Sequence, residues 1–263
     1  MKKYLVIGNP VDHSLSPKLH NYWFKKNNIH AVYEKKKINK EDIKDIIFQA
    51  RKGNLDGINV TTPFKNSVIP FLDQISPLAT ETQSVNTIYK KDNKIIGHNT
   101  DVGGFEFALK HIKYEVKNKE ILVLGAGGVV SSIVVALKKM KASKIILSNR
   151  TKEKAEKLKK NISGVEVINW GETPNFDMII NATSLGLKKD DQIKIDFSSI
   201  GLNKLFYDII YNPKQTEFLS KAKGLGNKTE NGKIMFIYQA RQAFNIWHKI
   251  LPTINNETIK LLD

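Results

Sequence analysis

Residues 120–149 read EILVLGAGGVVSSIVVALKKMKASKIILSN and contain the most informative pattern in the chain. An apolar run over 120–124 ends at a glycine turn, apolar side chains recur at helical spacing over 129–141, and a second apolar run follows over 144–149. Strand, glycine turn, helix and strand in this order form a βαβ unit, whose two strands are parallel. The stretch therefore predicts an open α/β domain built on a parallel sheet.

The glycine turn lies where a bound dinucleotide would place its pyrophosphate. Glycines let the backbone approach the phosphates closely, and the N-terminus of the following helix points amide groups at negative charge. Because strand, helix and next strand are all in place, the pattern favours a dinucleotide site over a purely structural turn. Val130 stands where a small residue normally lets helix and strand pack closely. The candidate contacts are Gly125, Ala126, Gly127, Gly128 and Val129.

The end of the second strand indicates which dinucleotide binds. NAD sites usually carry an acidic residue there for the ribose hydroxyls, whereas this chain has Asn149-Arg150-Thr151. The planar guanidinium of Arg150 can bind a 2′-phosphate through two parallel hydrogen bonds, and Asn149 and Thr151 can add neutral ones. Lys152 and Lys154 are either further phosphate contacts or part of a solvated helix face. The sequence therefore predicts NADP rather than NAD.

The net charge of +16 is the unusual number in the composition of this chain of 263 residues. It arises from 42 basic and 26 acidic residues, and only three of the basic residues are arginines. Proteins that read nucleic acids depend on arginine for bidentate contacts, and the lysines here are spread over the whole chain. The charge therefore predicts a lysine-rich solvated surface rather than a nucleic-acid partner.

The absence of cysteine excludes disulfides, thiolate zinc sites and cysteine nucleophiles. The six histidines show no ligand spacing, so we expect no metal. The apolar run before Gly8 is too short for a signal peptide or a membrane span. We therefore expect a cytoplasmic protein with no membrane partner.

The remaining patterns extend the α/β interpretation to the whole chain. In the first half we expect strands at 3–8, 31–38 and 56–61, a hairpin of 86–89 with 94–97, and helices at 16–27, 41–52 and 63–72. In the second half we expect strands at 165–168, 178–182 and 205–209 and helices at 105–112 and 151–161. A last helix near 236–251 carries Arg241, Asn245, His248 and Lys249 on its solvated face.

Polar residues follow the strands of the first half. Ligands of open α/β sheets bind beyond the carboxyl ends of the strands, so these side chains can converge on one site. Most are neutral donors and acceptors, which suits a polyhydroxylated substrate. Taken singly, each has an ordinary alternative: Ser16 and Asp101 as helix caps, Asn86 as a turn residue, and Lys65 as a surface lysine. The set is Ser14, Ser16, Asn59, Thr61, Lys65, Asn86 and Asp101.

Ordered motifs resemble those of the shikimate dehydrogenase family over residues 4 to about 250. In the first half they are GNPVDHSLSPKLHN (8–21), GINVTTPFK (57–65), VNT (85–87) and NTD (99–101). In the second half they are GAGG (125–128), NRT (149–151), NATS (181–184), YNP (211–213), NG (231–232) and QA (239–240). Several motifs in order are far more specific than any one of them.

The resemblance implies two open α/β domains flanking a cleft: residues 1–101 with 232–263 bind the substrate, and residues 102–231 form a Rossmann-type NADP domain. It implies reversible NADPH-dependent reduction of 3-dehydroshikimate to shikimate, on the route to aromatic amino acids, by a monomer or homodimer. Lys65 would be the acid/base and Asp101 would orient it. The other implied substrate residues are Ser14, Ser16, Asn59, Thr61, Asn86, Tyr211 and Gln239. The further implied cofactor contacts are Thr183, Ile209 and Gly232.

Four departures from the family pattern bear on the cofactor and on the rate. Gln83-Ser84 replaces a small pair, Ile234 replaces a glycine beside the expected nicotinamide position, Pro77 stands where many relatives are acidic, and Ile209 stands where a methionine is frequent. None of these positions belongs to the proposed acid/base pair.

Two alternative functions compete with this interpretation. One is a quinate/shikimate dehydrogenase that uses NAD, because the two substrates differ by one hydroxyl group. The other is a non-catalytic nucleic-acid-binding protein on a dinucleotide fold, which the charge alone motivates. The second needs clustered basic residues interleaved with stacking aromatics, a pattern that this sequence does not show.

Overall fold

The chain divides between two units, each built around its own sheet, in a computed structural model that describes residues 1–188, 190–198 and 200–263. The first unit comprises Met1–Phe105 and Ile237–Asp263, and the second comprises Glu106–Phe236. The unit boundaries fall inside helices α4 (Asp101–His111) and α8 (Lys233–His248), so each of these helices contributes residues to both units. The predicted domain boundaries, after residues 101 and 231, lie slightly earlier in the chain.

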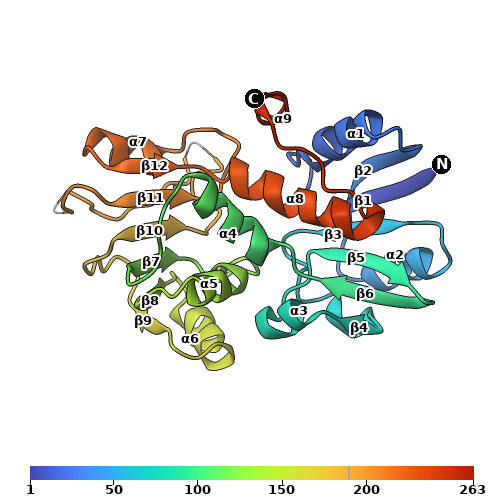
Figure 1. The fold of residues 1–263 in the computed structure, drawn as a ribbon. Helices are drawn as coiled ribbons and strands as arrows, with labels where there is room; N and C mark the ends of the chain where they lie inside the picture. The colour runs from blue at the N-terminus through green and yellow to red at the C-terminus, as the bar shows by residue number, and fades with distance from the viewer. Residues whose placement is uncertain (189, 199) are drawn as a thin grey trace. The chain divides into compact units, whose positions relative to one another are not determined.

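The second unit has a parallel six-stranded sheet in the order β9-β8-β7-β10-β11-β12, as Figure 1 shows. Its direction of growth reverses between β7 and β10, and the glycine turn follows β7 at this switch point, as in Rossmann-type sheets. The strands are β7 (Glu120–Leu124), β8 (Lys144–Ser148), β9 (Glu166–Ile168), β10 (Met178–Asn181), β11 (Leu205–Asp208) and β12 (Lys228–Glu230). The helices are α5 (Val130–Lys139), α6 (Lys152–Asn161) and α7 (Glu217–Gly224).

The first unit has a mixed sheet in the order β2-β1-β3-β5-β6-β4 (Figure 1). β1 pairs in parallel with β2 and β3, whereas β5 runs antiparallel to both β3 and β6. The strands are β1 (Lys2–Gly8), β2 (Ala31–Lys37), β3 (Gly57–Val60), β4 (Gln74–Ile75), β5 (Thr87–Lys91) and β6 (Lys94–His98). The helices are α1 (Ser16–Lys26), α2 (Ile43–Arg51), the 3₁₀ turn η1 (Ile69–Phe71), α3 (Pro77–Thr82) and α9 (Asn256–Lys260).

Alternation along β1 divides the core of the first unit into two layers. Leu5 and Ile7 belong to an aliphatic cluster with α2. Tyr4, which precedes Leu5 in sequence, meets the ring of Phe24 from α1 at 5.3 Å and that of Trp247 from α8 at 4.8 Å. Because successive side chains of a strand point to opposite faces, helices cover both sides of this sheet. The C-terminal half of α8 therefore completes the core of the first unit.

The helix predicted at 63–72 is wrong. The structure has turns there and only the short η1. Pro70 has no backbone N–H, so it cannot donate to the carbonyl of Asn66, and its ring disfavours a continuous helix. The sequence analysis also missed β4, α3, α7, β12 and α9, all of which have eight residues or fewer.

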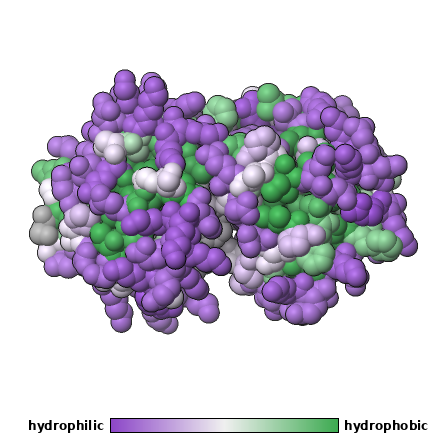
Figure 2. Space-filling view, turned by 90° about the horizontal axis from the view of Figure 1, so that it is seen from below, coloured by the Kyte–Doolittle hydropathy of each residue, from purple (hydrophilic) through white to green (hydrophobic). Residues whose placement is uncertain are grey.

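The surface is rich in charge. Figure 2 shows one face, on which hydrophilic residues predominate. Lys35, Lys36 and Lys37 are all exposed on β2, an edge strand, where charged side chains oppose pairing with another chain. Among the described residues, every helix is too short or too polar to cross a lipid bilayer.

Two histidines lie among the aromatic side chains between β1, α1 and α8. His20 is fully buried and stacks on Tyr33 at 4.4 Å, and neither of its ring nitrogens has a hydrogen-bond partner among the described residues. His248 lies 4.5 Å from Phe244. Its predicted place on a solvated face is therefore wrong, since helical spacing alone does not show how far the core extends around α8. Burial, assisted by the neighbouring His248, lowers the pKa of His20 to about 3.

Acid should destabilise the protein through His20. Its pKa is lower in the folded chain than in the unfolded chain, so the unfolded state binds more protons below about pH 6.5 and stability falls as pH falls towards 3. Urea unfolding at pH 7 and pH 4 should show that His20→Leu loses about 3 kcal/mol less stability over this range than the natural chain does. The exposed His13→Leu serves as the control. Equal losses in all three proteins would contradict the assignment.

Candidate active site

Four of the polar residues predicted in the first half meet around the start of β5: Asn59, Lys65, Asn86 and Asp101. Asn59 in β3 pairs with Thr87 across the antiparallel ladder, so Asn86 lies beside the carboxyl end of β3. The backbone N–H of Val60 donates to the carbonyl of Asn86 at 2.9 Å. Strand pairing, rather than closeness in sequence, brings these segments together.

Lys65 and Asp101 form a close ion pair. The lysine Nζ lies 2.6 Å from Oδ2 of Asp101, and their side chains are only 12% and 6% exposed. The other carboxylate oxygen, Oδ1, accepts a hydrogen bond of 2.9 Å from the amide of Asn86. Lys65 is therefore not a surface lysine. Its ammonium group has a defined position, as proton transfer to a bound substrate requires.

Asn86 connects the centre of this network. Its amide nitrogen also donates to Oγ1 of Thr100 at 2.8 Å and contacts Oε1 of Gln239 at 3.5 Å, while its Oδ1 accepts from the backbone N–H of Thr100 at 2.8 Å. With 3% exposure it is buried. The interpretation of Asn86 as a turn residue is therefore wrong. Gln239 reaches the network from α8, far away in sequence.

The alternative interpretation of Asp101 as a helix cap is also wrong. Asp101 is the first residue of α4, and Oδ1 of Asn99 accepts from the backbone N–H groups of Asp101 and Val102 at 3.0 and 3.2 Å. Asn99 is therefore the capping residue of α4. This leaves both carboxylate oxygens of Asp101 for Lys65 and Asn86.

Ser16 does not cap α1 either. It is the first residue of the helix, preceded by Leu15, whose side chain makes no capping bond. Instead, Oγ of Ser14 accepts from the backbone N–H of Ser16 at 3.3 Å and lies 3.2 Å from its hydroxyl oxygen. The two hydroxyl groups form a pair at the end of the loop that follows β1.

Asn59 is a supporting residue of the network. Its Oδ1 accepts from the hydroxyl of Tyr33 at 2.7 Å, and its amide donates to the carbonyl of Asn86 at 3.0 Å and to Oγ1 of Thr87 at 3.1 Å. The sequence analysis missed the contributions of Tyr33, Thr87 and Thr100. The last two lie inside the quoted motifs, whereas nothing in the sequence around Tyr33 indicates its partner.

The other two predicted substrate residues have separate surroundings. Thr61 is half-buried beside Gly8, where an added Cβ would lie 2.4 Å from the threonine Cγ2, so the glycine lets the two segments approach. Tyr211 belongs to the second unit, in which its ring lies 4.5 Å from that of Phe236.

The glycine turn of the second unit fits a dinucleotide. Gly125 has φ +118°, and an added Cβ would lie 2.8 Å from the carbonyl oxygen of Ala182, so the turn requires glycine there. A Cβ on Gly127 would meet no described atom within 4 Å, and the amides of Ala126 and Gly127 donate to no described residue. Packing within the described chain does not explain Gly127. Close approach of a phosphate to free amides does.

The first turn of α5 accommodates Val130 in place of a third glycine. Val130 is fully buried, and its backbone N–H donates to the carbonyl of Gly127 at 3.0 Å. Gly128 is exposed, and Val129 is the residue that precedes the helix. The turn therefore keeps its shape with valine at this position.

The end of β8 presents a basic group without an acidic neighbour in residues 149–152. Arg150 is exposed, and its guanidinium makes no hydrogen bond or ion pair within the part of the chain that is described. The Asn149 amide donates to the carbonyl of Thr151 at 2.7 Å, which shapes the turn, and Lys152 donates to Oδ1 of Asn169 at 2.8 Å. Lys154 is exposed. Arg150 is therefore available to an anion.

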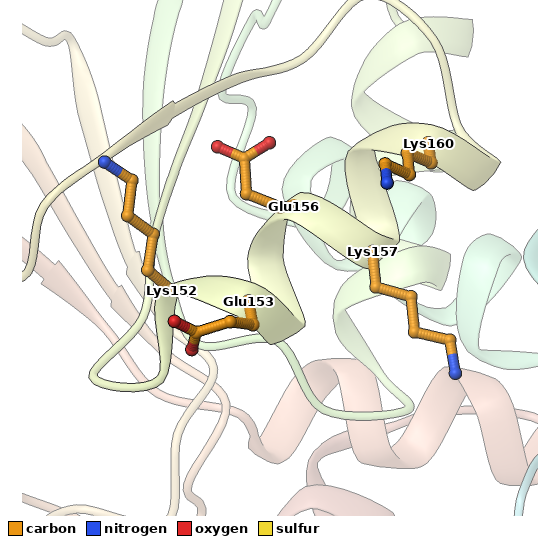
Figure 3. A pocket seen from close by; sticks show the side chains of 5 residues that line it. All are labelled: Lys152, Glu153, Glu156, Lys157 and Lys160. Atoms are coloured by element: carbon orange, nitrogen blue, oxygen red, sulfur yellow. The ribbon is translucent and has the colours of Figure 1, made fainter.

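A hollow runs along α6 beside this turn (Figure 3). All of its lining residues come from one helix, and two are glutamates, which oppose binding of an anion. We assign it no ligand. The lining residues are Lys152, Glu153, Glu156, Lys157 and Lys160.

Three further predicted cofactor residues lie just after β10, β11 and β12: Thr183, Ile209 and Gly232. Thr183 donates to Oδ1 of Asn181 at 2.7 Å, and its Cγ2 would lie 3.2 Å from a Cβ on Gly125. A Cβ on Gly232 would lie 2.0 Å from the carbonyl oxygen of Ile209, so only glycine fits there. These residues therefore flank the same end of the parallel sheet as the glycine turn.

The fold and these two clusters define a class: a two-unit α/β oxidoreductase, whose first unit carries a lysine–aspartate pair and whose second unit is a Rossmann-type dinucleotide unit. Comparison with known proteins identifies the family. The model of the shikimate dehydrogenase substrate binding domain matches residues 6–88, and that of shikimate / quinate 5-dehydrogenase matches residues 106–191. The chain belongs to the shikimate dehydrogenase family.

Individual relatives agree over the full length. The chain is 59% identical to a shikimate dehydrogenase (NADP(+)) of Pelagibacter ubique over 262 residues, 100% of this chain and 99% of that one. The crystal structure of the Aquifex aeolicus shikimate dehydrogenase has a TM-score of 0.91 at 39% identity, covering 100% and 97%. The crystal structure of the Thermus thermophilus enzyme in complex with NADP(H) and shikimate has a TM-score of 0.91 at 29% identity, and the match covers 100% of this chain and 98% of that one. The predicted family and fold class are confirmed.

Proposed function

We propose that this chain catalyses the reversible NADPH-dependent reduction of 3-dehydroshikimate to shikimate, a step towards chorismate and the aromatic amino acids. The observation that carries the proposal is the buried Lys65–Asp101 pair, held by Asn86, in a chain that resembles NADP-dependent shikimate dehydrogenases over its whole length. A charged pair that is nearly enclosed and precisely oriented is costly for stability, and this cost is common at reaction centres.

The proton chemistry belongs to Lys65. Its ammonium group donates a proton to the oxygen that becomes a hydroxyl, and the neutral amine takes the proton back in the reverse direction. Asp101 keeps the amine in place through its 2.6 Å contact and, in this proposal, also accepts a hydrogen bond from the substrate. NADPH, when bound, supplies the hydride.

The neutral polar groups hold the substrate. We assign binding of its hydroxyl and carboxylate groups to Ser14, Ser16, Thr61, Asn86 and Gln239, whereas a substrate role for Tyr211 stays a prediction from the family resemblance. Asn59 supports these residues and does not itself bind the substrate in this proposal, because its side-chain amide and carbonyl groups are already bonded to Tyr33, Asn86 and Thr87. A pocket of hydrogen-bond donors and acceptors discriminates against substrates that lack a matching hydroxyl.

The second unit binds NADP in this proposal. The turn Gly125–Gly128 and Val129 hold the pyrophosphate, while Arg150, with Asn149, Thr151 and Lys154, holds the 2′-phosphate. Thr183, Ile209 and Gly232 lie along the nicotinamide half. The amides of Ala126 and Gly127 and the guanidinium of Arg150, none of which is bonded within residues 1–188, 190–198 and 200–263, support these assignments. The cytoplasmic location and the monomeric or homodimeric state stay predictions.

A spectrophotometric assay that crosses shikimate and quinate with NADP and NAD tests the proposal. We expect the highest kcat/KM for shikimate with NADP. Preference for quinate with NAD would support the alternative dehydrogenase. Absence of reduced nicotinamide in all four combinations, with salt-sensitive retention on DNA or RNA, would refute an enzyme and support the nucleic-acid alternative.

A further inference from the structure

A buried carboxylate at the end of β11 has no place in the chemistry described above. Asp208 is 0% exposed and has no ion-pair partner among the described residues. It accepts three hydrogen bonds: from the amide of Asn181 at 3.0 Å, from the backbone N–H of Ile210 at 3.0 Å and from the hydroxyl of Thr216 at 2.6 Å. For stability alone, an apolar residue at such a position is often as good or better.

One side of Asp208 controls the segment after β10. Asn181, its partner across the parallel ladder, donates to Asp208 and also to the carbonyl of Leu185 at 3.0 Å. Oδ1 of the same asparagine accepts from the backbone N–H and hydroxyl of Thr183 at 3.1 and 2.7 Å. Asp208 thus orients the side chain that shapes residues 182–185. Ala182 of this segment is the residue that a Cβ on Gly125 would strike.

The other side of Asp208 controls the segment after β11. The same oxygen that accepts from Asn181, Oδ1, holds the N–H of Ile210, whose carbonyl accepts from the N–H of Gly232 at 3.1 Å. Gly232 in turn packs directly on the backbone of Ile209. A single carboxylate oxygen therefore joins the segments that contain Thr183 and Ile209, and through Ile210 it also connects to Gly232 after β12.

We propose that Asp208 is a positioning residue for NADP, which fixes the segments after β10 and β11 at the spacing that the nicotinamide half of the cofactor requires. The inference rests on the proposed function, since it takes NADP as the ligand of these segments. Burial raises the pKa of Asp208 to about 6, still below neutrality, so at pH 7.5 the group is a carboxylate that accepts all three hydrogen bonds.

Calorimetric titration with NADP+ at pH 7.5 tests the role, with thermal unfolding of each variant alongside. Asp208→Ala leaves the Ile210 N–H unpaired and frees Asn181, so we expect Kd to rise about tenfold. Asp208→Asn keeps an oxygen for Asn181 and Ile210, and its amide can donate to Thr216, so Kd should stay within about threefold of the natural value. In steady state, Asp208→Ala should raise KM for NADPH while kcat at saturating NADPH and KM for 3-dehydroshikimate change little.

Thr216→Val is the matched control. It removes a hydrogen bond from the other carboxylate oxygen, together with the cap of α7 that Thr216 provides to the N–H of Leu219 at 3.4 Å. We expect a lower Tm with an unchanged Kd. Should Asp208→Ala not fold, Asp208→Ser, whose hydroxyl reaches fewer donors, should show a smaller rise in Kd.

Natural affinity in both Asp208→Ala and Asp208→Ser would overturn the inference, as would an equal loss of affinity in Thr216→Val. Failure of the proposed function looks different, because the natural chain itself would then not bind NADP+.

Discussion

Lys65→Ala is expected to lower kcat for reduction of 3-dehydroshikimate by about 10²- to 10⁴-fold, which is the usual contribution of a general acid. The variant keeps Asp101 and the neutral groups assigned to the substrate, so KM should change by no more than about threefold. Stopped-flow or steady-state measurement of NADPH oxidation gives both parameters. The physical reason is that the described network around Asp101 holds no other amine that could donate a proton in place of the one 2.6 Å from its carboxylate.

Two further variants separate proton transfer from charge. Lys65→Arg keeps the positive charge, but a guanidinium does not deprotonate in proteins, so kcat should stay low. Lys90→Ala removes an exposed lysine of the same unit, which donates to the carbonyl of Arg51 at 2.8 Å, and should leave kcat unchanged. Near-natural turnover of Lys65→Ala would remove Lys65 from the mechanism, and recovery in Lys65→Arg would reduce its role to electrostatics.

Arg150→Ala is expected to raise KM for NADPH by about 10- to 100-fold, while KM for NADH stays the same. Hydrogen bonds to charged groups contribute about 1.5–3 kcal/mol each, and each 1.4 kcal/mol is a factor of ten. NADH lacks the 2′-phosphate, so it cannot lose this interaction. The measurement is kcat/KM with NADPH divided by kcat/KM with NADH, which should fall in the variant.

Neighbouring basic residues supply the controls for Arg150. Arg150→Lys keeps the charge but loses the planar fork, so its KM for NADPH should be intermediate. Lys154→Ala distinguishes a phosphate contact from a solvated helix face. If Lys154 contacts the phosphate, KM for NADPH alone should rise severalfold, and if it belongs to a solvated face, KM should not change. Parallel changes for NADPH and NADH in Arg150→Ala would show that the arginine does not select the 2′-phosphate.

Much of the fold could be read from local patterns. The strand, glycine turn, helix and strand at 120–149 were predicted nearly as the structure has them, because apolar periodicity and glycine chemistry depend on residues close in sequence. The helix predicted at 63–72 is wrong, since Pro70 cannot donate the backbone hydrogen bond that a continuous helix requires. The prediction that His248 lies on a solvated face of α8 is wrong. The rings of Tyr4 and Phe24 pack on His248, and both belong to other elements than α8.

The residues of the candidate site could likewise be predicted from the sequence only in part. Residue types and ordered motifs were enough to name Lys65, Asp101 and Asn86 and to identify the family. They did not show that Asn99 replaces Asp101 as the cap of α4, which leaves the carboxylate to Lys65. That outcome depends on the residue at which α4 begins, which is Asp101 itself.

Local periodicity, glycine positions and motif order belong to the linear chain, so they were sufficient for the α/β class, the dinucleotide turn and the preference for NADP. Partners of buried polar groups are a different matter, because strands far apart in sequence must pair before those groups meet. The bond from Tyr33 to Asn59 and the bond from Asn181 to Asp208 arise in this way. Burial then raises the cost of a missing partner, so the packed structure, and not the pattern of residues, settles which side chains support the site.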